Sequence, residues 1–445
     1  MSYRGKNVAV LGIGRSGEAA ALLLVCLGAK VSLLDSAEAE VIGAAKLEKL
    51  SGMGMAVLTG EAANTDSTVY DLAVLSPGID PKIVLVQNFL ERGIPVIAEI
   101  ELAYQSSSTP VIGITGTNGK TTTTELVAAM LTDAGVRTVA GGNIGKPYSE
   151  IIKEGEPNDV ITLEVSSFQL ERIQKFRPAI SVWLNLTPDH LDRYTDENEY
   201  RNAKLRIFEN QTADDWAIVN FRDQLPPLTA KRLTFSAYEV GADLHLQDEV
   251  IHYKDLPLLD PRETHLRGRH NTENLMAALG IGLARGLTPE QMSPALRAYR
   301  PQSHRCEVIR ELDGVLYVND SKATNLDAME KALTSEDRPV ILIAGGKDKG
   351  FAFDTVGELV GQRARWVVLI GEMAERIAAA WKEHVPCERA DTLSEAVTIA
   401  WSIARSGEVV LFSPGTSSFD MFKSYADRGN QFRALVQALR STVPS

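Results

Sequence analysis

Short runs of consecutive apolar residues recur along the chain, and most end in a glycine-rich or acidic turn that precedes a segment of helical period. Such runs of Val, Ile and Leu are typical of parallel strands buried on both faces. They form three series: residues 8–11, 31–34, 72–75 and 95–97; residues 111–114, 161–165, 180–184 and 217–220; and residues 340–344, 366–370 and 409–412. The pattern therefore predicts three α/β domains.

Two breaks in this pattern separate the three series. Residues 104–110 lack periodicity and end in a proline, and residues 299–304 follow a helical stretch that starts near Asn271. We therefore place the domains at residues 1–107, 108–302 and 303–445. Within the second, residues 221–265 contain short alternating pieces, which predict a small antiparallel excursion from a mostly parallel sheet.

The composition fits a globular chain with sizeable cores, since 44% of its 445 residues are hydrophobic and 23% are charged. A net charge of −12 argues against the broad basic surface that non-specific nucleic-acid binding requires. The three cysteines show no paired spacing, which excludes a disulfide framework and fits a reducing compartment. No apolar run is long enough to span a membrane. We therefore expect a cytoplasmic protein with no membrane insertion and no nucleic-acid partner.

The first apolar run is followed by Gly-Ile-Gly-Arg-Ser-Gly at residues 12–17, and the second run ends in Asp35. This spacing is typical of a Rossmann-like domain, in which the glycines bring backbone amides close to a pyrophosphate and the acid binds a ribose. From the residues alone, a nicotinamide cofactor, another pyrophosphate-containing ligand and a turn without a ligand all remain open.

The run at residues 111–114 leads into a second glycine motif, which carries a stronger signal for a phosphate loop. It places a lysine and a threonine at the start of a predicted helix, residues 122–134, as nucleoside triphosphate sites do. Ile114 stands where the strict pattern has glycine, so the loop is a variant. The expected ATP-binding residues of the loop are Gly116, Thr117, Asn118, Gly119, Lys120, Thr121 and Thr122. The motif therefore predicts that the central domain is similar to P-loop ATPases.

Acidic and histidine side chains stand at the ends of two neighbouring runs of the central domain. Glu164 ends the run at residues 161–165, where a carboxylate can hold Mg²⁺ beside the phosphate loop. His190 follows the run at residues 180–184, among acids, at the edge where parallel sheets bind ligands. We treat both as candidates for the site.

Together, the loop at residues 116–121 and the Asp189-His190 segment resemble the Mur ligase family, the ATP-dependent amide-forming enzymes of peptidoglycan synthesis. The resemblance covers essentially the whole chain. It implies ATP and two Mg²⁺ ions, the first held by Thr121 and Glu164 and the second by His190 and Lys204. The segment around Lys204 is similar to the helix that bears the family's carbamylated lysine, whereas the residues alone predict a solvated position.

The third domain is similar to the D-glutamate-adding members of the family, and it is expected to be a second Rossmann-like domain. The similarity lies in residues 304–305, 318–325, 413–420, 422–423 and 428–429, although Tyr425 stands where Phe is expected. It implies a glutamate site made by Thr324, Lys349, Ser418 and Phe419. The register around Lys349 also allows Lys347 as the carboxylate contact.

The resemblance implies a reaction that joins D-glutamate to UDP-N-acetylmuramoyl-L-alanine through an acyl phosphate. Asn143 and Lys322 are then expected at the transferred phosphate, and Asn274, Arg305 and Asp320 at the nucleotide. The base for the glutamate amine stays open, because His190 is also a metal-ligand candidate. The first glycine motif would bind the UDP moiety, with these expected contacts: Gly14, Arg15, Ser16, Asp35, Ser36, Ser76, Pro77 and Gly78.

The implied biology is cell-wall biogenesis, with links to cell shape and cell division. We expect a monomer whose third domain closes on the second when nucleotide binds. Every implied ligand is an anion, so attraction must come from local groups such as Lys120, Arg305 and Lys322, against an unfavourable net charge.

Overall fold

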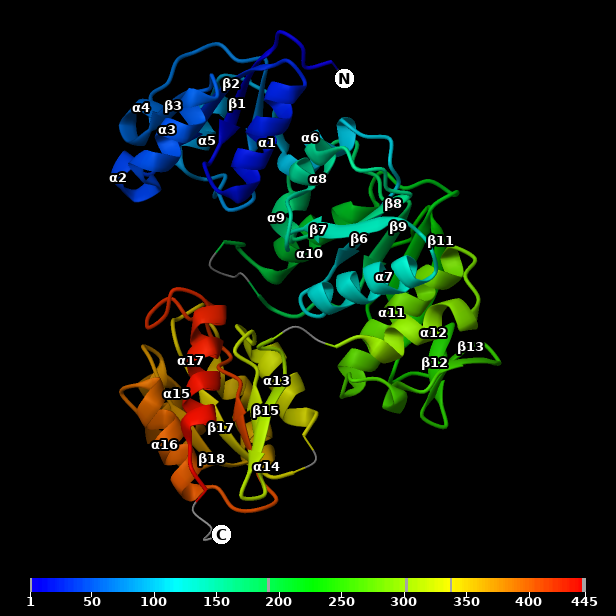
Figure 1. Cartoon of the computed structure of the whole chain (residues 1–445), viewed down its shortest axis with the longest axis vertical. Helices are drawn as coiled ribbons and strands as arrows, with labels where there is room; N and C mark the ends of the chain where they lie inside the picture. The colour runs from blue at the N-terminus through cyan, green and yellow to red at the C-terminus, as the bar shows by residue number, and fades with distance from the viewer. Residues whose placement is uncertain (1, 190–192, 301–302, 337, 442–445) are drawn as a thin grey trace. The chain divides into compact units, whose positions relative to one another are not determined.

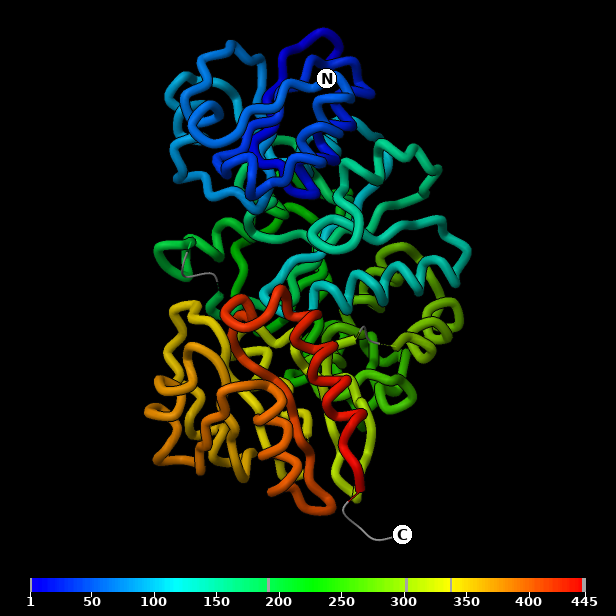
Figure 2. The backbone as a smooth tube through the Cα atoms, turned by 60° about the vertical axis from the view of Figure 1, so that its left-hand side comes forward, coloured from blue at the N-terminus to red at the C-terminus, as the bar shows by residue number. Residues whose placement is uncertain are grey.

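The computed structural model describes residues 2–189, 193–300, 303–336 and 338–441, and Figures 1 and 2 trace the chain through them. Contacts divide the chain into two compact units. Unit 1 comprises Met1–Leu186, Asp196–Asp260 and Glu273–Arg297, and unit 2 comprises Thr187–Thr195, Pro261–Thr272 and Ala298–Ser445.

The N-terminal part of unit 1 is a five-stranded sheet of order β3-β2-β1-β4-β5, in which all neighbouring strands are parallel. Its strands are β1 (Asn7–Leu11), β2 (Lys30–Asp35), β3 (Ala56–Thr59), β4 (Leu72–Leu75) and β5 (Val96–Ala98). Its helices are α1 (Arg15–Cys26), α2 (Ala39–Ile42), α3 (Ala44–Gly52), α4 (Gly60–Asn64), α5 (Val84–Glu91) and α6 (Glu99–Gln105). The sequence pattern missed β3, a four-residue edge strand in which no residue is fully buried.

The second sheet of unit 1 has nine strands in the order β14-β13-β12-β11-β10-β9-β6-β8-β7. They are β6 (Val111–Thr115), β7 (Thr138–Gly142), β8 (Val160–Glu164), β9 (Ile180–Trp183), β10 (Trp216–Asn220), β11 (Lys231–Ser236), β12 (Leu244–Gln247), β13 (Val250–Tyr253) and β14 (Leu256–Leu259). Only the pairings of β13 with β12 and β14 are antiparallel, which confirms the predicted excursion.

Among the described residues, eight helical segments are interspersed with these strands or follow them in the chain, and the label η marks the short 3-10 helices among them. They are α7 (Lys120–Asp133), α8 (Tyr148–Glu154), α9 (Ser167–Leu170), α10 (Glu197–Leu205), η1 (Arg206–Phe208), η2 (Pro261–Glu263), α11 (Arg269–Ala284) and α12 (Pro289–Ala298). The first, α7, starts at the lysine of the phosphate loop. The predicted helix at residues 122–134 is therefore present as α7, two residues longer at its start and one shorter at its end.

Unit 2 contains a six-stranded sheet of order β15-β16-β20-β17-β18-β19, parallel except for the pair β15–β16. Its strands are β15 (Glu307–Leu312), β16 (Val315–Asn319), β17 (Val340–Ala344), β18 (Ala364–Leu369), β19 (Cys387–Arg389) and β20 (Val409–Phe412). Its helices are α13 (Leu326–Thr334), η3 (Phe353–Val356), α14 (Gly357–Arg363), α15 (Ala374–Trp381), α16 (Leu393–Ile403) and α17 (Tyr425–Ala438).

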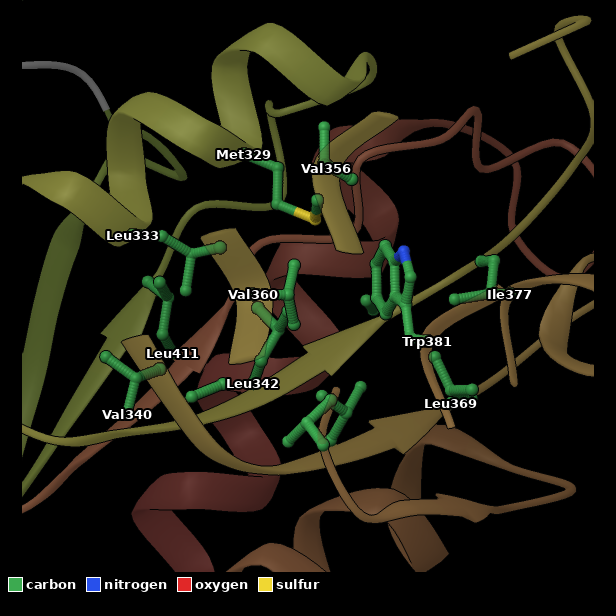
Figure 3. Packing of buried hydrophobic residues seen from close by; sticks show 14 of the residues in the cluster. Met329, Leu333, Val340, Leu342, Val356, Val360, Leu369, Ile377, Trp381 and Leu411 are labelled. Atoms are coloured by element: carbon green, nitrogen blue, oxygen red, sulfur yellow. The ribbon is translucent and has the colours of Figure 1, made fainter. Parts of the chain in front are cut away.

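One face of this third sheet is covered by a large apolar cluster, shown in Figure 3. Leu342 and Leu411 of the strands pack there with Met329 of α13, Val360 of α14 and Trp381 of α15. The three mostly parallel sheets and their helices confirm the predicted fold class. The domain boundaries at residues 107 and 302 stay a prediction.

Helix α6 contributes to both cores of unit 1, because its opposite faces are apolar. Leu102 belongs to the core of the N-terminal sheet, whereas Ile100 and Ala103 belong to the core of the central sheet. The same helix also buries two carboxylates, Glu99 and Glu101. Glu101 accepts hydrogen bonds from three consecutive backbone amides, at residues 174–176, each at 2.9 Å.

Glu99 is held less well. Its Oε1 accepts from the Ser149 amide of α8 at 2.6 Å, and its Oε2 is buried with no hydrogen-bond partner among the described residues. Burial raises the pKa of this carboxyl from 4.5 to about 7. The folded protein therefore binds this proton more tightly than the unfolded chain does, so the free energy of unfolding falls as the pH rises from 4.5 to 7.

Replacement of Glu99 by Gln is therefore expected to stabilise the protein increasingly with pH. Gln keeps an acceptor for the Ser149 amide and removes the cost of ionising a buried group. The gain should grow from about 1 kcal/mol at pH 5 to about 3 kcal/mol at pH 8, measured by urea unfolding. Glu101→Gln should be destabilising instead, since it puts a donor beside backbone donors. A pH-independent effect of Glu99→Gln would contradict the buried carboxyl.

Candidate active site

The phosphate loop of unit 1 joins the carboxyl end of β6 to the start of α7. Gly119 adopts φ +84°, and a Cβ there would lie 2.2 Å from Oδ1 of Asn274, so the position requires glycine. The Lys120 ammonium donates to the carbonyl oxygens of Gly116 at 3.0 Å and Thr117 at 2.8 Å. The lysine is thus held against the loop that would receive the phosphates.

Glu164 is the acid that the structure places beside this loop. It ends β8, the neighbour of β6, so both strands present their carboxyl ends at one edge of the sheet. Its Oε2 accepts from the Thr121 hydroxyl at 2.8 Å, and its Oε1 accepts from Nδ2 of the Asn143 side chain at 2.7 Å. The glutamate, threonine and asparagine predicted for the site therefore lie together. A carboxylate and a hydroxyl oxygen in contact fit the oxygen ligands that Mg²⁺ prefers.

Lys204 of α10 also contacts the phosphate loop. Its side chain is 1% exposed, so the solvated position that the residues alone predicted is wrong. Its Nζ donates to the Gly116 carbonyl at 2.9 Å and lies 4.6 Å from the ring centre of Tyr200, one turn earlier on the helix. The Tyr200 hydroxyl is 3.3 Å from Oγ1 of Thr117. Lys204 and Tyr200 are four residues apart and therefore share the face of α10 that lies against the loop.

Asn274 of α11 also reaches this region of unit 1. Its Oδ1 accepts from the Thr123 hydroxyl at 3.3 Å in the first turn of α7. Together with its approach to Gly119, this contact places the predicted nucleotide residue at the phosphate loop. His190, the remaining metal-ligand candidate, lies outside the described residues.

The first glycine motif forms the turn between β1 and α1. A Cβ at Gly17 would lie 1.9 Å from the Gly12 carbonyl oxygen, so helix and turn meet too closely for a side chain. Asp35 accepts hydrogen bonds from the amides of Ile13 at 2.7 Å and Ala37 at 2.9 Å. The acid therefore shapes the turn itself, which the sequence pattern did not indicate.

The other residues predicted to contact UDP lie around the same edge of the N-terminal sheet. The turn after β4 holds Ser76, Pro77 and Gly78, and Ser76 Oγ lies 3.9 Å from the Cβ position of Gly14. The Ser36 hydroxyl donates to the Asn64 side chain at 2.9 Å. Arg15 is mostly exposed and forms an ion pair with Glu150 of α8 at 3.5 Å. Ser16 follows it in the first turn of α1.

In unit 2, the predicted residues gather where β16, β17 and β20 end. Asp320 follows β16 and is buried, which raises its pKa to about 6, and its carboxylate accepts from the Ser413 hydroxyl at 2.8 Å and the Cys306 amide at 3.1 Å. Lys322 lies 5.6 Å from the ring centre of Tyr425. Thr324 precedes α13 in the same loop. Ser418 is buried and Phe419 is mostly exposed.

The alternatives Lys347 and Lys349 differ in their surroundings. Lys349 is partly buried, and its Nζ contacts Oδ1 of Asp189 at 3.1 Å. The other carboxylate oxygen of Asp189 accepts from the Asn325 side chain at 3.1 Å. Lys347 is exposed and is fixed through its backbone amide, which donates to the Ser417 carbonyl at 2.9 Å. Lys349 is therefore the lysine whose side chain is held by a described contact, whereas Lys347 is held through its backbone.

A cavity of about 380 Å³ in unit 2 adjoins the predicted nucleotide residue Arg305. Its lining also includes Asn271, Cys306, Leu316 and Val318, so it combines apolar walls with polar groups. Such a mixture is common in sites for organic ligands.

Arg428 of α17 is a residue of this region that the sequence did not indicate as functional. Its guanidinium is fully buried and donates to Ser321 Oγ at 3.0 Å, to the Ser321 carbonyl at 2.8 Å and to the Thr416 carbonyl at 3.3 Å. Burial lowers its pKa to about 10. Arg428 therefore ties the loop after β16 to the loop after β20. An arginine within a largely polar helix gives no sequence signal for this role.

Among the described residues, no helix is long and apolar enough to cross a membrane.

Three family models match the chain in sequence order: "Mur ligase MurD-like, N-terminal domain" over residues 6–98, "Mur ligase middle domain" over residues 114–282, and "Mur ligase, glutamate ligase domain" over residues 304–416. Together they cover most of the chain.

Relatives and solved structures agree with these matches. The UDP-N-acetylmuramoylalanine–D-glutamate ligase of Geotalea daltonii is 41% identical over 449 residues, which cover 99% of each chain. The UDP-N-acetylmuramate–alanine ligase MurC of Thermotoga maritima has a similar fold, with a TM-score of 0.62 at 18% identity over 97% of this chain and 99% of that one. The MurF ligase of the same organism, solved in complex with ADP, gives 0.58 at 17% identity over 98% and 96%.

The resemblance inferred from the phosphate loop and the Asp189 segment is confirmed by matches that extend over nearly the full length of both chains. The chain therefore belongs to the Mur ligase family.

Proposed function

We propose that this protein is an ATP-dependent ligase that joins D-glutamate to UDP-N-acetylmuramoyl-L-alanine in peptidoglycan synthesis. The observation that carries the proposal is the group formed by Lys120, Thr121, Asn143 and Glu164 at the phosphate loop. The family uses ATP with Mg²⁺, and the full-length relatives at 41% identity are D-glutamate ligases. The alternative of a nicotinamide oxidoreductase has no support from these relatives.

The chemistry follows from the poor leaving group of a carboxylate. Transfer of the γ-phosphoryl group from ATP to the substrate carboxylate forms an acyl phosphate and releases ADP. The glutamate amine then attacks the acyl carbon, an amide bond forms, the C–O bond to phosphate breaks, and the amine gives up a proton. The protein contributes mainly positioning and charge neutralisation.

The roles within unit 1 follow from the contacts. The amides at the start of α7 and the Lys120 ammonium would bind the phosphates, and Asn143 would contact the transferred group. Thr121 and Glu164 would hold a Mg²⁺ ion, which supplies charge neutralisation when bound. His190 and a carbamylated Lys204 are proposed to hold a second. The turn after β1 is proposed to bind UDP.

The residues of unit 2 complete the proposal. Arg305, Asp320 and Lys322 would serve the nucleotide and the acyl phosphate, and Thr324, Lys349, Ser418 and Phe419 the glutamate. Closure of residues 303–445 onto residues 108–302 would bring them to the phosphate loop. We propose a cytoplasmic location, since the three free cysteines suit a reducing compartment. We propose separately that the protein is a monomer.

Phosphate release tests the proposal directly. With ATP, Mg²⁺ and UDP-N-acetylmuramoyl-L-alanine, D-glutamate should give a rate at least about 100-fold above that with D-alanine. D-alanine lacks the side-chain carboxylate and would leave the proposed lysine contact unpaired. L-Alanine and meso-diaminopimelate are further comparisons. Equal rates with all four amino acids would refute the substrate assignment, and slow hydrolysis indifferent to amino acids would indicate a nucleotide switch.

A further inference from the structure

Asn185, the second residue after β9, makes an unusual set of contacts with the phosphate loop. Its side-chain Oδ1 accepts from the backbone amide of Asn118 at 2.9 Å, and its Nδ2 donates to the Asn118 carbonyl at 3.1 Å. Its own backbone carbonyl accepts from the Thr117 amide at 3.0 Å. Two successive loop residues are therefore bonded to one residue of the neighbouring strand end.

The two side-chain bonds require a carboxamide. Only Asn and Gln carry an acceptor and a donor side by side, and Asn has the shorter reach. A carboxylate would oppose the Asn118 carbonyl, and an apolar side chain would satisfy neither backbone group. Gly116 of the loop also lies close to the residues after β9, since a Cβ at Gly116 would lie 2.9 Å from Cβ of Leu184 and 3.2 Å from the Asn185 nitrogen. The loop therefore rests directly on the end of β9.

These bonds determine which way the loop faces. Because the Asn118 amide and carbonyl are both hydrogen-bonded to Asn185, the Asn118 backbone is fixed just before α7, and the amino end of a helix is where a phosphate loop binds phosphate. Lys120 Nζ is held by Gly116 and Thr117, on the same fixed segment. A cradle that is already ordered loses less conformational entropy when its ligand binds.

We propose that Asn185 is a positioning residue that presets the phosphate loop for nucleotide binding. The proposal rests on the proposed function only in taking ATP as the ligand of this loop. It does not depend on which amino acid is joined. Asn185 acts through the Asn118 backbone, and its loss should weaken nucleotide binding specifically.

Calorimetry with Mg²⁺-ADP tests this on the full chain without turnover. Asn185→Ala and the milder Asn185→Ser should raise the Kd for Mg²⁺-ADP about 10- to 30-fold, the equivalent of two ordinary hydrogen bonds. The KM for ATP should rise by a similar factor. The Kd for the UDP-substrate should stay within about two-fold. A raised Kd for Mg²⁺-ADP beside an unchanged Kd for the UDP-substrate distinguishes an effect on the loop from general destabilisation.

Gln211→Ala is the matched control. Gln211 also carries a buried carboxamide that bridges backbone groups. Its Nε2, the counterpart of Nδ2 in asparagine, donates to the carbonyls of Pro178 at 2.9 Å and Trp216 at 3.0 Å, at the amino ends of β9 and β10, whereas Asn185 follows the carboxyl end of β9. It should lower the melting temperature and leave the Kd for Mg²⁺-ADP unchanged. The proposal is overturned if folded Asn185→Ala or Asn185→Ser binds Mg²⁺-ADP within two-fold of the unmodified protein, or if Gln211→Ala weakens binding as much. Failure of the D-glutamate assay alone would refute the substrate and leave this result valid.

Discussion

Replacement of Lys120 by Ala is expected to lower the rate of phosphate release by about 1,000-fold or more. The Lys120 ammonium lies at the start of α7 on the Gly116 and Thr117 carbonyls, within reach of the phosphates that the loop would bind. Negative charge develops on the transferred phosphoryl group and on the departing ADP. Without this cation, the phosphate loop itself would stabilise that charge only through its backbone amides.

Lys231→Ala provides a control for the loss of one lysine. Lys231 begins β11, at the amino edge of the same sheet, and lies over the Trp216 ring at 5.6 Å. It should keep nearly full activity. Lys120→Arg tests geometry, because a guanidinium retains the charge but is larger than the ammonium. Near-normal turnover of a folded Lys120→Ala protein would refute the phosphate-loop assignment.

The parts of the fold that the sequence predicted are those whose strands are buried on both faces. The runs at residues 111–114 and 340–344 became β6 and β17, every residue of which is buried. Two of the missed strands have weak patterns: β7 consists largely of small residues, and β19 is a three-residue edge strand with two exposed side chains. Edge strands need little burial, so hydrophobic patterning does not reveal them.

The candidate site divides in the same way. Motif spacing identified Lys120 and Thr121, because a phosphate loop is local in sequence. The contacts of Asn185 and Lys204 with that loop span 67 and 88 residues of sequence, and no local pattern encodes them. Asp35 shows the converse limit: its spacing suggested a ribose ligand, whereas its carboxylate accepts from one backbone amide of the glycine turn, at Ile13, and from one after β2, at Ala37.

Lys204→Arg is expected to lower the rate of phosphate release by about 100-fold or more, as is Lys204→Ala. The proposed carbamate forms when CO₂ reacts with a neutral lysine amine, and it replaces a cation by an anion that can hold Mg²⁺. Arginine keeps the positive charge and cannot form a carbamate. If Lys204 acted only as a cation, on the Gly116 carbonyl at 2.9 Å, arginine would preserve much of the activity.

Dependence on CO₂ separates these two roles further. Depletion of bicarbonate from protein and buffer should slow phosphate release by the unmodified protein, and added bicarbonate should restore the rate. The Lys204→Arg rate should respond to neither. Because Lys204 is 1% exposed and contacts the Gly116 carbonyl and the Tyr200 ring, exchange of the carbamate should be slow, and activity should decay over the course of depletion rather than at once. An active Lys204→Arg protein that is indifferent to bicarbonate would assign this lysine to support of the loop and remove it from the metal site.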